Sequence, residues 1–137
     1  MKNVILWLFV VSLSSFTAVA PSGNFDFVGK WTGKDDAGVT GGFIFDKEGY
    51  ITMTKGDDTM GGKDFVIEGN RGSMKYTIDQ SAKPIKLDII MEANGRTKKA
   101  LLIIKIVDKN TIVVAGDMNS IRPKAITKDN SITLTRQ

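Results

Sequence analysis

The sequence predicts an all-β domain, an antiparallel up-and-down barrel of about eight strands. After the N-terminal region, apolar and polar residues alternate in short segments, which is typical of half-buried strands. Clusters of Gly, Asn and Asp separate these segments at intervals of about 8 to 12 residues. Beyond the N-terminal apolar run, no long stretch has a helical period. These observations favour a barrel or sandwich over a fold that contains helices.

The first element is an N-terminal leader. Lys2 supplies a positive charge, residues 4–11 form an unbroken apolar run, and Ala18 and Ala20 are the small residues that signal peptidase requires. We therefore expect residues 1–20 to be a secretory signal peptide.

The junction after the leader leaves one alternative open. Pro21 is a poor residue for cleavage directly after Ala20, so an uncleaved N-terminal anchor remains the alternative to cleavage there or at another position. The apolar run is shorter than the about 20 residues that a membrane span needs. Residues 21–137 are therefore expected to be a barrel domain without a membrane span, in the periplasm or outside the cell.

The first strands of the domain are expected to include a hairpin. Residues 28–34 open the domain, and two phenylalanines share one face of residues 42–45. Residues 46–49 turn the chain into residues 50–54, where Ile and Met occupy the face opposite Tyr and Thr. The glycine-rich residues 55–63 are expected to form a loop.

The middle of the chain predicts two longer strands. A short strand at residues 65–67 is followed by a turn at residues 68–72. Residues 73–79 alternate cleanly, with Met, Tyr and Ile on one face. Residues 84–92 alternate in the same way, and Asn94-Gly95 is the strongest hairpin signal in the chain.

The last segments complete roughly eight or nine strands. Residues 99–107 are apolar on both faces, which indicates that both are partly covered. Residues 111–116 and 131–136 are the remaining strands. Between them, residues 117–130 are irregular, and Pro123 argues against a central strand there.

Composition excludes several functions. The chain has 19 basic and 15 acidic residues, and because lysines alternate with acids, no nucleic-acid partner is expected. It has neither His nor Cys, which excludes disulfides, Ser-His and Cys-His dyads and the usual zinc or copper sites. We expect no cofactor, no metal and no catalytic residue. A carboxylate-based enzyme is the least favoured alternative.

The Gly-Lys-Trp at residues 29–31 resembles the signature of the lipocalin and calycin barrels. That resemblance implies that Gly29 and Trp31 close one end of the barrel and that Arg136, near the last strand, lies over the indole; Arg122 is the reserve candidate. A guanidinium stacked on indole contributes about 0.5 to 2 kcal/mol. The chain also resembles the shorter lipocalin-like domains of exported bacterial proteins. A weaker resemblance to avidin-like barrels implies no biotin site, because the domain has one tryptophan.

The family resemblance also implies which side chains point into the barrel. A small hydrophobic ligand is expected to contact these residues, although an ordinary core is the favoured explanation for their apolar side chains. Tyr50 and Tyr76 are the stronger candidates, because a buried phenol needs a polar partner and a ligand can supply one. The candidate ligand-binding residues are Phe43, Phe45, Tyr50, Met53, Tyr76 and Met91.

Two charged clusters have ordinary explanations. The acidic pairs at residues 35–36 and 57–58 lack the spacing of an EF-hand loop and are typical of turns. Arg96, Lys98 and Lys99 form the densest basic cluster at a hairpin tip, where a solvated turn is expected.

Two functional hypotheses follow. The leading one is a non-enzymatic, exported lipocalin-like binding module for a small hydrophobic ligand. The alternative is a structural or protein-interaction barrel with a filled core, which binds a protein partner through its exterior. Leu101 and Ile103, on the second face of their strand, favour this alternative, because exposed apolar area often marks a contact surface.

Overall fold

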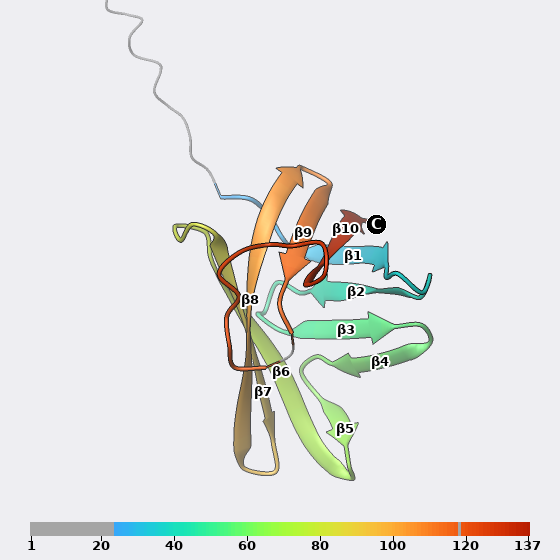
Figure 1. Cartoon of the computed structure of the whole chain (residues 1–137). Coiled ribbons are helices and arrows are strands. Elements are labelled where there is room, and N and C mark those ends of the chain that lie inside the picture. The colour runs from blue at the N-terminus through green and yellow to red at the C-terminus, as the bar shows by residue number, and fades with distance from the viewer. Residues whose placement is uncertain (1–23, 118) are drawn as a thin grey trace, which may run out of the picture.

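Antiparallel strands form one ten-stranded sheet that curls into a nearly closed barrel (Figure 1). The structure is a computed structural model that describes residues 24–117 and 119–137, so the expected signal peptide lies outside the described residues. No described residue lies in a helix, and therefore no helix in this part could cross a membrane. The strands are β1 (Gly29–Lys34), β2 (Thr40–Phe45), β3 (Ile51–Lys55), β4 (Asp58–Gly61), β5 (Phe65–Ile67), β6 (Asn70–Asp79), β7 (Ile85–Ala93), β8 (Arg96–Asp108), β9 (Thr111–Ala115) and β10 (Ser131–Arg136).

The strand order makes this an up-and-down barrel. Each strand pairs with its chain neighbours, except that β4 and β5 do not pair and the last strand, β10, pairs with β1. The seam between the β4 and β5 edges is bridged by the amide of Met74, which donates to Gly62 O at 2.8 Å, and that of Tyr76, which donates to Gly49 O at 2.9 Å. Beyond this bridge β4 and β5 diverge without pairing, at the end of the barrel that we call the open end (Figure 1).

The expected all-β antiparallel architecture is confirmed, but the expected count of about eight strands is wrong. The missed strand is β4, which lies within the segment expected to be a loop. Lys55 and Asp58 pair across a two-residue turn, and Gly56 takes a φ of +61°, which favours glycine. Met53 then pairs with Met60. A glycine-rich segment with one apolar residue therefore forms a strand, because a preceding strand offers it a partner.

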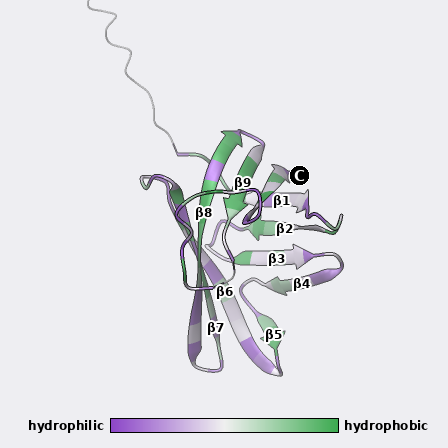
Figure 2. Ribbon diagram, in the orientation of Figure 1, coloured by the Kyte–Doolittle hydropathy of each residue, from purple (hydrophilic) through white to green (hydrophobic). Residues whose placement is uncertain are grey.

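The hairpin between β7 and β8 is longer than expected. Asn94 and Gly95 both have positive φ, +54° and +74°, as a type I′ turn requires. The turn pairs Ala93 with Arg96, and β8 therefore begins at Arg96 rather than at residue 99. The hairpin extends to the lower end of the molecule, as does the turn between β5 and β6, and its tip is hydrophilic (Figures 1 and 2).

The centre of the barrel is filled by the protein's own side chains. Burial of each large apolar side chain contributes about 1.5 to 3 kcal/mol to stability. The inward-facing side chains that are less than 2% exposed are Trp31, Phe45, Ile51, Met74, Leu87, Ile89, Ile104, Ile112 and Leu134.

A second buried cluster lies outside the barrel wall. Ile103 and Ala115 pair across β8 and β9, are 1% and 0% exposed, and do not belong to the interior core. Residues 119–130, which we call the strap, lie across β8 in Figure 1. Leu101 and Ile103 were expected to form an exposed contact surface. This expectation is wrong for Ile103, which is buried, whereas Leu101 is half-buried and keeps part of its side chain exposed.

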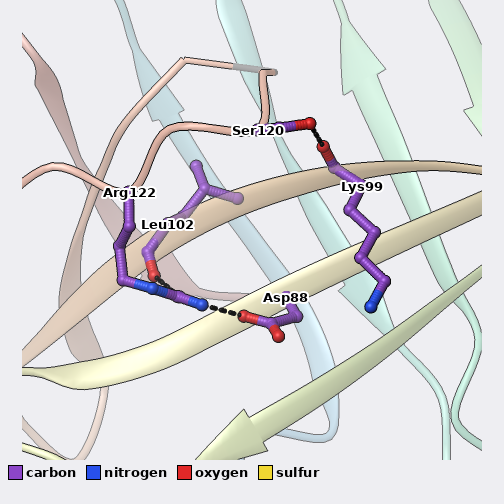
Figure 3. Close-up of polar contacts among 5 residues, drawn as sticks. All are labelled: Asp88, Lys99, Leu102, Ser120 and Arg122. Atoms are coloured by element: carbon purple, nitrogen blue, oxygen red, sulfur yellow. Dashed lines mark hydrogen bonds and ion pairs between the residues drawn. The ribbon is translucent and has the colours of Figure 1, made fainter.

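Polar contacts fasten the strap to β7 and β8 (Figure 3). The amide of Leu101 donates to Asn119 O at 3.0 Å, which continues the sheet beyond β9. Arg122 donates to Leu102 O at 2.8 Å and forms an ion pair with Asp88 at 2.6 Å. Ser120 Oγ donates to Lys99 O at 3.1 Å. The strap is thus anchored from its first residues to Arg122.

Candidate binding site at the open end of the barrel

One end of the barrel is closed around Trp31. The guanidinium carbon of Arg136 lies 4.3 Å from the centroid of the Trp31 ring. The indole Nε1 donates to Phe27 O at 2.9 Å. Arg136 also donates to three backbone carbonyls, those of Asp26, Val28 and Lys109, at 2.9, 3.1 and 3.1 Å. These contacts tie the segment before β1, the β8–β9 turn and the last strand together.

The closed end requires a glycine at position 29, because the backbone there has a positive φ. Its φ is +134°, a conformation that side chains rarely adopt, and a Cβ there would lie 3.5 Å from a guanidinium nitrogen of Arg136. Arg122, the reserve partner of Trp31, instead belongs to the strap and pairs with Asp88.

A further residue of the closed end, Gln80, was missed from the sequence. Its side-chain Oε1 accepts from the amide of Phe25 at 2.9 Å, and its Nε2 donates to Phe25 O at 2.8 Å. The Phe25 ring lies against Phe27, with centroids 4.6 Å apart. This clasp joins positions 55 residues apart. Because no local pattern marks such a contact, the sequence carried no signal for it.

Three of the candidate ligand-binding residues lie together within the core. The rings of Phe45 and Tyr76 have centroids 4.8 Å apart, and those of Phe43 and Phe45 are 5.8 Å apart. The Tyr76 hydroxyl donates to Asp46 O at 2.8 Å. Burial raises the pKa of Tyr76 above its usual value, and the nearby carboxylates of Asp46 and Asp26 raise it further. The phenol therefore has its polar partner within the protein.

Tyr50 lies apart from this group. It pairs with Lys75, an exposed residue of β6, whose neighbours Met74 and Tyr76 face inward. Alternation along the chain places Tyr50 on the outer side of the wall, opposite the buried Ile51.

The two remaining candidates, Met53 and Met91, lie toward the open end. Both are partly buried and packed against the interior core. Met53 borders a hollow of about 200 Å³ with Phe43 and Ile132. Met91 borders two larger hollows, of about 680 and 240 Å³. The open end therefore offers space beside the core, whereas the centre is filled.

The two hollows beside Met91 form the candidate site. They share Met91 and Lys98, which are paired residues of β7 and β8. The larger hollow continues over Ile67, Ala93 and Arg96, and the smaller reaches Ile89 and the strap residues 119 and 120. The apolar lining residues, which we call the apolar floor, are Ile67, Ile89, Met91, Ala93 and Ala100. The other lining residues are polar or charged, and the cations lie toward the tip of the hairpin.

The two cations of the site were expected to belong to a solvated turn. The Asn94-Gly95 signal could have placed them, because a two-residue turn pairs Ala93 with Arg96 and Met91 with Lys98. Paired residues share a face, so both cations lie on the face that carries Met91.

Nothing in the described part of the chain assembles a metal centre. No group of three or more acidic side chains lies close enough there to hold an ion. The Asp35 carboxylate instead accepts from the amides of Ala37 and Val39, both at 2.9 Å, which is turn chemistry.

Comparisons with family models, with curated proteins and with solved structures found no match for this chain.

Proposed function

We propose that this protein is an exported, non-enzymatic, lipocalin-like binding module that holds a small hydrophobic molecule at its open end. The observation that carries the proposal is the pair of adjoining hollows that share Met91, next to a filled barrel centre. The larger hollow, of about 680 Å³, is within the range of ligand pockets, which measure about 300 to 1,000 Å³, and the smaller adds about 240 Å³ beside it.

The division of the barrel into a closed and an open end supports this proposal. Trp31 and Arg136 cover one end, so a ligand would enter at the other, where β4 and β5 diverge (Figure 1). Apolar side chains with a few polar groups are typical of binding pockets. Methionine is suited to such a floor, because its unbranched, polarizable side chain adapts to different shapes.

Binding of a neutral apolar dye, N-phenyl-1-naphthylamine, tests the proposal. We expect the wild-type protein to enhance its fluorescence and Met91→Trp, which fills the shared hollow, to weaken binding at least about tenfold. Val66→Trp is the matched control, because Val66 is 68% exposed on the outer side of β5. Equal binding by both variants, or none by the wild type, would contradict the proposal.

A protein-interaction barrel is the second candidate, and the filled centre favours it. A barrel packed with its own side chains is a rigid scaffold that needs no ligand. Native mass spectrometry of the protein purified from its own cells separates the two. A bound small molecule supports the binding module, whereas a co-purified polypeptide without one supports the interaction barrel.

A further inference from the structure

The cations of the open end occupy an unusual position in the barrel. Arg96 and Lys98 share the inward face of the β7–β8 hairpin with Ala93 and Met91. On most strands of this protein that face carries apolar residues, which form the core. Two consecutive inward-facing positions of β8 are therefore basic, and the next two, Ala100 and Leu102, are buried and apolar.

The charges around these positions are mostly positive. The two hollows are bordered by Arg96, Lys98 and Lys99, and Glu68 is the one acidic residue among the residues that line them. In the part of the chain that the structure describes, the ion pairs are Asp64 with Arg71 and Asp88 with Arg122. Arg96 and Lys98 thus lie beside an apolar floor without a protein carboxylate at ion-pair distance.

From this arrangement we infer the chemical class of the ligand, an inference that rests on the proposed function. We propose that the open end binds an anionic, single-chain amphiphile. Its carboxylate or phosphate head lies between Arg96 and Lys98, and its hydrocarbon chain lies over Met91 toward Ile89.

The side chains suit both parts of such a molecule. A guanidinium presents a planar fork of donors that matches carboxylate and phosphate oxygens, and an ammonium adds a mobile point charge. Burial of each methylene of the chain is favourable, so a longer chain binds more tightly until the floor is covered. The hollow that extends to Ile89 lies beside the buried core, which gives the chain a direction inward from the cations.

Three probes with the same hydrocarbon chain separate the contribution of the head group to binding from that of the tail. Dodecanoate, dodecyl phosphate and dodecanol are titrated into the full-length protein, each below its aggregation concentration, and binding is measured by calorimetry. We expect at least one anionic probe to bind at least about fivefold more tightly than dodecanol, in line with the strength of a partly exposed ion pair. The preferred head shows whether the site favours a carboxylate or a phosphate.

Charge reversal locates the head. Lys98→Glu is expected to weaken binding of the preferred anion about fivefold or more and to leave dodecanol binding unchanged. Lys30→Glu, an exposed site on β1, makes the same change in net charge away from the open end and is expected to have little effect. Thermal unfolding of both variants checks that the fold is intact.

The outcomes distinguish the two proposals. If dodecanol binds as tightly as both anions and Lys98→Glu has no effect, the inference about the head is wrong and the binding module stands. Equal weakening by Lys98→Glu and Lys30→Glu would also contradict it, because the effect would then be one of net charge. If none of the three probes binds, both the inference and the proposed function fail.

Discussion

The guanidinium carbon of Arg136 lies 4.3 Å from the centroid of the Trp31 ring, and the two residues are paired across β10 and β1. The contact therefore joins the last strand of the chain to the first. It covers the indole, which is 0% exposed, while the guanidinium keeps hydrogen bonds to three carbonyls. The end closed in this way lies opposite the end at which we propose that a ligand binds.

Removal of the arginine is expected to weaken this closure. We predict that Arg136→Ala lowers the free energy of unfolding by about 2 kcal/mol, through the lost cation–π contact and hydrogen bonds. Urea denaturation measures the change. Arg71→Ala, which breaks an exposed pair with Asp64, is the control and should have no measurable effect. Equal effects of the two changes would contradict a structural role for Arg136.

The clasp between Gln80 and Phe25 is expected to hold the segment before β1 in place. Gln80→Ala removes both hydrogen bonds, and we predict a loss of about 1 to 2 kcal/mol together with faster hydrogen exchange at the Phe25 amide. Gln80→Glu keeps the acceptor and should protect that amide in part. Gln137→Ala changes an exposed glutamine and serves as the control. An unchanged exchange rate in Gln80→Ala would disprove the clasp.

The strap is expected to depend on its ion pair. The Arg122 and Asp88 side chains are 22% and 31% exposed, so their pair is better shielded from solvent than that of Arg71 and Asp64. A double-mutant cycle with Arg122→Ala and Asp88→Ala should give a coupling of about 1 kcal/mol. Exchange of the Leu101 amide, which donates to Asn119, should accelerate in both single variants. Zero coupling would mean that the strap is held by its other contacts.

The raised pKa of Tyr76 leads us to predict a loss of stability at alkaline pH. Burial raises the pKa of its phenol in the folded state above the unfolded value of about 10. The folded state therefore holds the proton more tightly, and its stability is complete below about pH 10 and falls as the pH rises toward the folded pKa. Tyr76→Phe should make this fall shallower, as measured by urea denaturation between pH 8 and about 11. Tyr50→Phe is the matched control. An identical pH profile for Tyr76→Phe would contradict the role of this phenol.

The fold class and most strands could be predicted from the sequence, because alternation reports burial on one face. In residues 74, 76 and 78 this pattern is clean, and Met74 and Tyr76 do face the interior. The Asn94-Gly95 turn is encoded by two adjacent residues that tolerate positive φ. By contrast, β4 has little apolar content and forms because β3 is there to pair with it.

The site was harder to predict because it depends on long-range placement. Alternation already places Tyr50 on the face opposite Ile51, which is the outer side. The hydrogen bond of the Tyr76 hydroxyl to Asp46 O joins positions 30 residues apart, and no local pattern marks it. The buried Ile103 lines a hollow together with strap residues Ala125 and Ile126, which the chain reaches only after β9. Lys98 was interpreted as part of a solvated tip, although the turn register places it opposite Met91.

Methyl NMR of the protein labelled with ¹³C at its methionines tests directly whether an anionic amphiphile binds beside Met91. Met53, Met60, Met74 and Met91 all belong to the core or pack against it, but Met91 alone among these four borders both hollows of the site. On titration with dodecanoate or dodecyl phosphate, we predict that the largest shift occurs at Met91 and that Lys98→Glu reduces it. A largest shift at Met53, or no shift at any of the four, would contradict binding at this site.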